Sequence, residues 1–208
     1  MAYRLAAFDF DGTLADSFHY FVSNVNSLAR RHHFREMDPS RLDEYRGLEP
    51  RELMRTHGVP MWKMPFIAKD FMALMSRDVA RVRPFAGIVE GLQSLSAKGV
   101  ALAIVTSNSD DNVRRVMGDE FMRHVRHLEC GASMFGKKRR LERVLRAAGL
   151  DRGCCIYVGD QTNDGDAARD AGIAFGAVQW GYASRESLER CGPALRFRGV
   201  ADLQLIAE

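Results

Sequence analysis

The sequence lacks the features that mark membrane, secreted and zinc-binding proteins. No stretch approaches the roughly 18 uninterrupted apolar residues that a membrane-spanning helix needs. The early apolar run is broken at Asp9 and Asp11, unlike that of a signal peptide. The four cysteines form neither a CxxC pair nor a dense disulfide framework, and the six histidines form no HExxH pattern. We therefore expect a cytoplasmic protein with free thiols, no membrane partner and no zinc.

The charges of the chain are almost balanced. Its 30 basic and 27 acidic residues leave a net charge of +3, which is too small an excess to attract nucleic acid or an anionic membrane. We expect no nucleic-acid partner, whereas a small anionic substrate stays open. The 208 residues, 46% of them apolar, suit one globular domain that carries a smaller insert.

Four short apolar runs predict β-strands. Each run is apolar at successive positions, which is typical of parallel strands that helices cover on both faces. Helix-compatible stretches alternate with the runs, so we predict an α/β fold with a doubly wound, Rossmann-like parallel sheet. The predicted strands are 5–8, 100–105, 154–158 and 173–178, and the predicted helices include 88–97, 111–117, 139–148 and 164–171.

The segment 16–83 interrupts this alternation. It contains no convincing strand and many helix-compatible residues, and a proline directly after it is a helix-terminating residue. We predict an all-helical cap at 16–83, inserted between the two parts of the core, 1–15 and 84–208. Its methionines, with Trp62, Phe66 and Phe71, could line a ligand pocket, but packing between helices explains them more simply.

Polar side chains follow the predicted strands, at the edge where open parallel sheets bind ligands. Asp9 and Asp11 leave the same side of an extended segment, so one site can use both. A hairpin turn at Asp11-Gly12 is the alternative, but residues 14–17 show no returning strand. The other polar residues at this edge are Thr106, Ser107, Asn108, Asp160 and Asp164, and the basic cluster Lys137, Lys138, Arg139 and Arg140 opens a helix.

Some of these residues also have a structural interpretation. Asp160 and Asp164 could cap a helix, and for Asp164 the two interpretations stay equally open. Lys137 could lie on a solvated helix face. However, cations at a helix N-terminus oppose the helix dipole, so the basic cluster indicates an anionic partner nearby.

Several carboxylates in one cleft need a cation, because like charges at short distance repel and would force protonation. Oxygen ligands without nearby His or Cys favour Mg²⁺, which also shares phosphate oxygens. A bound phosphoryl group would use this whole set of residues. One Asp could attack phosphorus, a second could act as general acid and base, Thr106 and Ser107 could donate hydrogen bonds, and a lysine could neutralise charge.

The residues in this order resemble the four signature motifs of the haloacid dehalogenase superfamily, in its phosphatase branch. Residues 9–14, DFDGTL, resemble the first motif, and residues 106–108, TSN, the second. Lys137 resembles the third motif, and Gly159-Asp160 with Asp164 the fourth. The helical insert after the first motif resembles the cap of phosphoglycolate phosphatase-like members.

The resemblance implies a role for each motif residue. Asp9 would be the nucleophile, Asp11 the general acid and base, Thr106 a phosphoryl ligand and Lys137 the charge clamp. Mg²⁺ would be held by Asp160, by a carboxylate oxygen of Asp9 and by the backbone carbonyl of Asp11, with support from Asp164. Many relatives place a proline directly after the third-motif lysine, whereas Lys138 follows here, so either lysine could be the clamp. Asp166 is likewise an alternative to Asp164 as the outer metal ligand.

The expected function is a Mg²⁺-dependent phosphatase that hydrolyses a small phosphorylated metabolite, such as a phosphoglycolate-like compound or a sugar phosphate, through an aspartyl phosphate. A phosphomutase of the β-phosphoglucomutase type and a non-enzymatic phospho-Asp signalling domain are the alternatives. For substrate binding we expect Ser107 and Asn108, with Arg46 and Arg51 from a substrate-facing loop of the cap. That loop could equally be a helix start. We expect a monomer or a homodimer.

Overall fold

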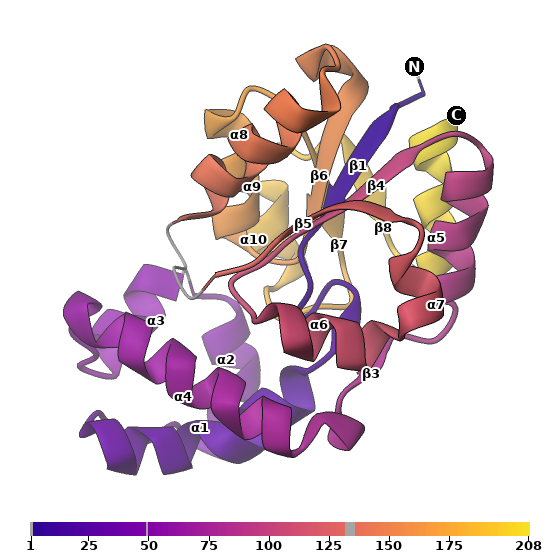
Figure 1. The fold of residues 1–208 in the computed structure, drawn as a ribbon. Coiled ribbons are helices and arrows are strands. Elements are labelled where there is room, and N and C mark those ends of the chain that lie inside the picture. Colours follow the sequence, from indigo (N-terminus) through magenta and orange to yellow (C-terminus); the bar gives the residue numbers. More distant parts are fainter. Residues whose placement is uncertain (1, 49, 132–135) are drawn as a thin grey trace.

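The structure is a computed structural model of the chain, and it describes residues 2–48, 50–131 and 136–208 (Figure 1). Its centre is a parallel six-stranded sheet in the order β5-β4-β1-β6-β7-β8. These strands are β1 (Leu5–Phe8), β4 (Ala101–Val105), β5 (Val125–Glu129), β6 (Cys155–Gly159), β7 (Ala174–Val178) and β8 (Leu195–Phe197).

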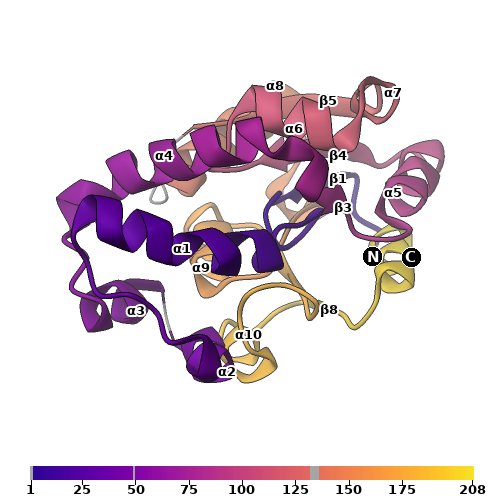
Figure 2. The same cartoon turned by 90° about the horizontal axis from the view of Figure 1, so that it is seen from below.

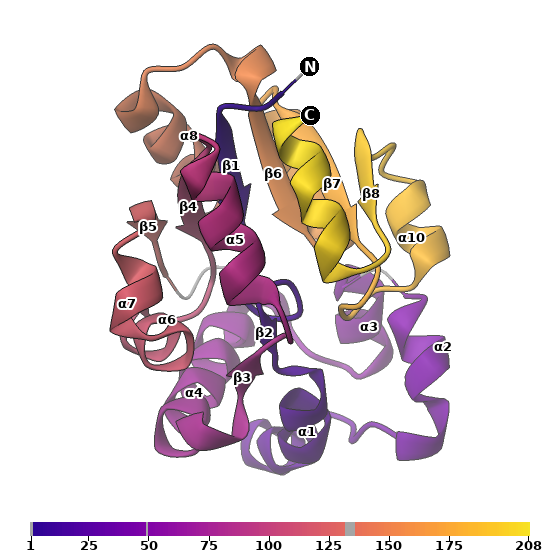
Figure 3. The same ribbon diagram turned by 90° about the vertical axis from the view of Figure 1, so that its right-hand side faces the viewer.

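Helices cover both faces of the sheet, so the core has three layers. Alternate residues of β1 belong to different apolar clusters, with Ala6 and Phe8 on one face and Leu5 and Ala7 on the other. The first cluster includes residues of α5 (Ile88–Ala97), α6 (Asp110–Met117), α7 (Asp119–Met122) and the 3₁₀ helix at Val200–Ala207. The second includes residues of α8 (Lys137–Ala148), α9 (Thr162–Asp170) and α10 (Arg185–Glu189). Figure 3 shows the face of the sheet that is covered by α5 and the C-terminal 3₁₀ helix, which belong to the first cluster.

The predicted α/β fold with a Rossmann-like parallel sheet is confirmed. All four predicted strands are present within one or two residues, because each is buried on both faces. The prediction missed β5 and β8. Residues 125–129 of β5 have only two apolar side chains, Val125 and Leu128, and are mostly half-buried at the sheet edge, so they contain no continuous apolar run.

The segment between the first strand and α5 forms a separate group of helices at one end of the sheet (Figure 1). A short antiparallel ribbon of β2 (Ala15–Asp16) and β3 (Arg83–Pro84) joins it to the core. Its helices are α1 (Phe18–His32), α2 (Leu42–Arg46), α3 (Pro50–Thr56) and α4 (Met64–Arg77), with 3₁₀ turns at Pro39–Arg41, Met61–Lys63 and Val79–Arg81. The domain boundaries at 16 and 83 stay a prediction.

The topology places a ligand-binding edge beside β1. From β1 the chain passes to β4 and β5 on one side and then returns to β6 on the other. The carboxyl ends of β4, β1 and β6 therefore lie next to one another at the switch point of the strand order, where open α/β sheets bind ligands. Among the described residues, no helix is long and apolar enough to cross a membrane.

Candidate active site

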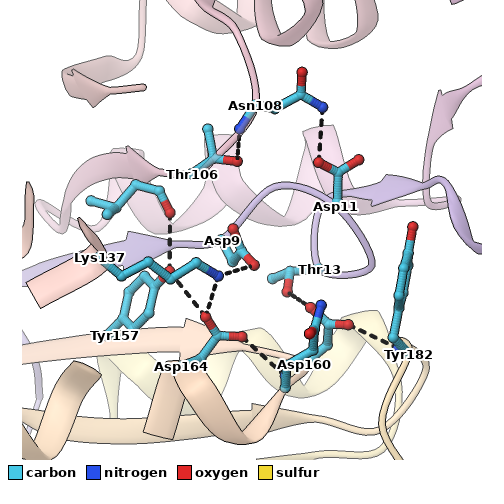
Figure 4. Close-up of polar contacts among 12 residues, drawn as sticks. Asp9, Asp11, Thr13, Thr106, Asn108, Lys137, Tyr157, Asp160, Asp164 and Tyr182 are labelled. Carbon is cyan, nitrogen blue, oxygen red and sulfur yellow. Dashed lines mark hydrogen bonds and ion pairs between the residues drawn. The ribbon is translucent and has the colours of Figure 1, made fainter. Parts of the chain in front are cut away.

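The candidate active site lies where the three central strands end. Asp9 directly follows β1, Thr106 follows β4 and Asp160 follows β6, and all three are buried. Figure 4 shows these side chains converging on one small volume at the sheet edge, together with Lys137 from α8 and Asp164 from α9. The structure therefore brings together residues that are up to 155 positions apart, from Asp9 to Asp164.

Lys137 is the cation at the centre of the site. As the first residue of α8 it is 4% exposed, and its Nζ lies 2.6 Å from Asp9 Oδ2 and 2.5 Å from Asp164 Oδ1. Burial lowers the pKa of Lys137, but the attraction of Asp164 and Asp9 outweighs it, so the pKa is raised and the side chain is charged. Lys138 is exposed, and the geometry therefore favours Lys137 over its neighbour.

Three buried carboxylates lie close together in the site, and two of them contact this lysine. Ligand oxygens of Asp9, Asp160 and Asp164 all lie within 4.8 Å of one another. Burial, with a contribution from the neighbouring carboxylates, raises the pKa of Asp9 to about 7 and that of Asp160 well above its ordinary value. One lysine cannot neutralise three carboxylates. This oxygen-only cluster therefore fits a hard divalent cation such as Mg²⁺.

Asp160 is held in place from both sides. Thr13 Oγ1 donates to Asp160 Oδ1 at 2.8 Å, and the backbone N–H of Tyr182 donates to Oδ2 at 2.8 Å. Gly12 has a φ of 77°, and a Cβ there would lie 2.3 Å from Asp160 Oδ2. The glycine in the turn after β1 therefore serves two purposes, since it permits the left-handed backbone and leaves space for this carboxylate.

Asp164 caps α9 and also faces the acidic cluster. The backbone N–H of Gln161 donates to Asp164 Oδ2 at 3.0 Å, as in a capping box at the start of α9, while Oδ1 contacts Lys137. Tyr157 OH also donates to Oδ1, at 3.3 Å. Asp166 is exposed and pairs with Arg169 on the outer face of α9, so it lies away from the cluster.

Asp11 is fixed by the segment that follows β4. Asn108 Nδ2 donates to Asp11 Oδ2 at 2.8 Å, and the backbone N–H of Asn108 donates to Thr106 Oγ1 at 3.0 Å. Burial raises the pKa of Asp11, and the hydrogen bond from Asn108 opposes part of that rise. Ser107, between these two residues, lines a cavity together with Asp9 and Asp11. The turn at Asp11 is not a hairpin, because β2 pairs with β3 rather than with β1.

The structure separates the two arginines of the expected substrate loop. Arg46 lines the same cavity as Asp9, whereas Arg51 is exposed and is not among the described residues of the lining. The assignment of the cap's methionines and aromatic residues to helix packing was incomplete. Met54, Met64 and Phe71 line the cavity, while Met61, Trp62 and Phe66 are exposed on the outside.

Sequence reasoning missed three residues that support the carboxylates: Thr13, Tyr157 and Tyr182. Thr13 lies inside the first motif, but nothing in the sequence showed that its hydroxyl reaches Asp160. The segment containing Tyr182 follows β7. Ligand-binding residues of parallel sheets follow the carboxyl ends of strands, and β7 was among the predicted strands. Applying this rule to β7 would have indicated the segment that contains Tyr182.

Comparison with known proteins assigns the chain to a family. The haloacid dehalogenase-like hydrolase family matches residues 6–178, and the chain belongs to that family. A haloacid dehalogenase-like family hydrolase from Streptococcus pneumoniae has the same fold, with a TM-score of 0.79 at 17% identity and coverage of 99% of both chains.

Curated relatives narrow the class further. A phosphoglycolate phosphatase of Synechococcus elongatus is 27% identical over 197 residues, which cover 94% of this chain and 93% of the relative. A 5'-nucleotidase of Pseudomonas aeruginosa is 26% identical over 221 residues, which cover 100% and 97%. The resemblance to the phosphoglycolate phosphatase-like branch is confirmed, and so is the expected enzyme class, a phosphoric monoester hydrolase.

Proposed function

We propose that this enzyme hydrolyses the phosphate monoester of a small metabolite in a Mg²⁺-dependent reaction, with Asp9 as the nucleophile. The observation that carries the proposal is the position of Lys137 Nζ between Asp9 and Asp164, beside the third buried carboxylate, Asp160. A phosphoryl group placed against Asp9 would meet the buried positive charge of Lys137, which would stabilise its oxygens. Burial of a lysine with several carboxylates contributes little to stability by itself, so a role in binding phosphate explains the arrangement better than a purely structural role.

The residues that would hold Mg²⁺ are Asp9 and Asp160, with Asp164 in support and, as the family resemblance implies, the backbone carbonyl of Asp11. When bound, the ion supplies positive charge that offsets the negative charge of the carboxylates and of the phosphoryl oxygens. Thr13 and Tyr182 hold Asp160 at a fixed position, so this part of the site is formed before any ligand arrives.

The proposed reaction has two steps. A carboxylate oxygen of Asp9 attacks phosphorus, the ester P–O bond breaks, and the leaving alkoxide takes a proton from Asp11. The product of this step is an aspartyl phosphate at Asp9. In the second step Asp11 takes a proton from water, the water oxygen attacks phosphorus, and the bond to Asp9 breaks to release inorganic phosphate.

The surroundings of Asp11 suit both of its tasks. Burial raises its pKa, which favours the protonated form that the first step requires. The hydrogen bond from Asn108 fixes the direction of the carboxyl group, and Asn108 is itself held by the backbone of Ser109 and by Asn112. Lys137 stays charged throughout and stabilises the phosphoryl oxygens.

The first test of this function is metal dependence. We expect the purified protein to release phosphate from 4-nitrophenyl phosphate over many turnovers in Mg²⁺, and to lose this activity in excess chelator until Mg²⁺ is restored. Stimulation by a sugar bisphosphate, with transfer to sugar instead of release to water, would identify a mutase. A single stoichiometric phosphorylation without turnover would identify a signalling domain.

A second prediction separates the metal site from the reaction. In Asp160→Asn we expect the metal-free protein to have a higher melting temperature than the wild type, because one carboxylate with a raised pKa no longer has to be buried charged. The same variant should lose the stabilisation that Mg²⁺ gives the wild type, as bound ligand stabilises only a protein that binds it. Thermal melting with and without Mg²⁺ measures both effects.

The matched control for this experiment is Asp166→Asn, which changes an exposed carboxylate two residues beyond Asp164. It should keep the response to Mg²⁺ in full. If Mg²⁺ raised the melting temperature of Asp160→Asn as much as that of the wild type, the result would contradict the assigned metal ligand.

A further inference from the structure

The acidic cluster lies at one end of a cavity that continues into the helical segment. The cavity has a volume of about 270 Å³, and Asp9, Asp11 and Lys137 line one end of it. Its remaining walls include residues from α1, α2, α3 and α4. Figure 2 shows α1 and α4 running side by side along this segment. A molecule whose phosphate reaches Asp9 would therefore have the rest of its structure among these helices.

The walls within the helical segment are apolar. The lining residues of α1 are at positions 18, 21, 22 and 28, and those of α4 are at 64, 67, 68 and 71. Each set falls on one side of its helix, so each helix turns one apolar face to the cavity. These residues include Phe21, Val22 and Leu28 on α1, and Ile67, Ala68 and Phe71 on α4. A polar or charged group in contact with these faces would lose its hydration without gaining a partner.

Arg46 is the one charged residue among the described lining residues of this segment. Its Nη2 donates to the carbonyl of Gly181 at 2.6 Å and its Nε to that of Tyr182 at 3.2 Å. Its guanidinium also stacks over the ring of Phe18, 4.7 Å from the centroid. The Nε and Nη2 edge, which would bind a carboxylate in bidentate fashion, is therefore already used to join α2 to the core.

The cavity is partly open to solvent, and most of its exposed lining surface is apolar. An apolar pocket that is continuous with a nucleophile is typical of a small-molecule site, so we expect a ligand with an apolar group to occupy it. The volume is just below the roughly 300–1,000 Å³ of typical small-molecule sites. We propose that the substrate is the phosphate monoester of an apolar alcohol or phenol, whose alkyl or aryl group occupies the cavity between α1 and α4.

This inference rests on the proposed phosphomonoesterase function and names the substrate class of the same site. It departs from the phosphoglycolate-like substrate expected from the sequence, because glycolate has no apolar group that would fill the cavity between α1 and α4. The required affinity comes from apolar contact, so it should increase with the apolar area of the leaving group.

The test is a series of n-alkyl phosphates from ethyl through butyl to hexyl phosphate, assayed by phosphate release in Mg²⁺. Their alcohols have nearly the same acidity, so the ester bonds are equally hard to break and only apolar area changes. We expect kcat/KM to rise about fourfold per added CH₂ group, as transfer of that group from water predicts. We expect 2-phosphoglycolate to have a kcat/KM at least about tenfold below that of butyl phosphate.

A substitution in the cavity wall provides a second measurement. Ala68→Phe would fill part of the cavity, so the ratio of kcat/KM for hexyl to that for ethyl phosphate should fall about tenfold. Lys69→Ala, at the exposed neighbouring position of α4, should leave the ratio unchanged. Circular dichroism and thermal melting verify that both variants are folded, and the wild-type series remains decisive if Ala68→Phe is not.

The outcomes distinguish this inference from the function on which it depends. A kcat/KM that stays flat or falls along the alkyl series, or a preference for 2-phosphoglycolate, would overturn the apolar substrate class and leave the phosphatase intact. A complete lack of Mg²⁺-dependent phosphate release from every ester would overturn both.

Discussion

Replacing Asp9 by asparagine is expected to lower kcat for 4-nitrophenyl phosphate at least about 10⁴-fold, the order of loss that follows removal of an enzymatic nucleophile. The amide of asparagine is nearly the same size as the carboxylate but cannot form the acyl phosphate. Because the reaction has no second carboxylate in an equivalent position, the neighbouring Asp11 should not substitute for it. Single-turnover measurement of phosphate release gives the residual rate.

The same substitution is expected to preserve or increase the stability of the metal-free protein. Burial raises the pKa of Asp9 from its ordinary 3.8 to about 7, so the folded state disfavours the charged form. Stability due to this group is therefore greatest at low pH and falls as the pH rises from about 4 to about 7. Asparagine does not ionise, so the variant avoids this loss of stability. We expect the melting temperature of Asp9→Asn to exceed that of the wild type by more at pH 8 than at pH 5.

If Asp9 had a purely structural role, its replacement would lower stability. Loss of activity with undiminished stability in Asp9→Asn would therefore indicate a catalytic role. Asp16→Asn is the matched control, since it makes the same chemical change at an exposed position of β2. It should retain activity within about twofold and stability within about 0.5 kcal/mol. Robust turnover by the Asp9 variant would refute the assigned nucleophile.

The sequence was most informative where strands are buried on both faces. Such strands give continuous apolar runs, and the polar residues after β1, β4 and β6 then mark the sheet edge without any knowledge of the topology. The strand β8 is only three residues long and is charged at its centre, so no such run was present. The sheet order, which makes the three site strands neighbours, is visible only in the structure.

Some alternatives that the sequence left open could have been decided by helix phase. Leu141, Val144 and Leu145 form the buried face of α8, and Lys137 lies four residues before Leu141 on that same face. By the same rule Asp164, rather than Asp166, shares the buried face of Ala167 and Ala168 on α9. The contacts of Thr13 and Tyr182 with Asp160 could not be found this way, because they join segments that are far apart in the chain.

The cavity is a property that sequence alone could not supply. Apolar residues at helical spacing on α1 and α4 are compatible with a close-packed core and with a hollow one. Which of these forms depends on how the helices are spaced, and that is set by distant contacts such as those of Arg46 with Gly181 and Tyr182. The substrate class therefore depends on packing more than on any motif.

Replacing Lys137 by alanine is expected to reduce both activity and stability, whereas Lys138→Ala should change neither by much. Loss of a preorganised charge beside the transferring group costs about 10²–10³-fold in kcat. Removal of one partner from a buried ion pair costs about 3–5 kcal/mol, because here Asp9 and Asp164 would remain buried without their cation. For a chain of this length that corresponds to a melting temperature lower by roughly 10 °C.

The pH dependence of this loss identifies its cause. Lys137 is charged at both pH 5 and pH 8, since its pKa is raised, so any difference between the two values comes from the carboxylates that it faces. At pH 5 Asp9, whose pKa burial raises, readily takes up a proton and relieves the repulsion, whereas at pH 8 that protonation is less favourable. The destabilisation by Lys137→Ala should therefore be larger at pH 8. Equal, mild effects of the two lysine substitutions at both pH values would show that neither lysine is the clamp.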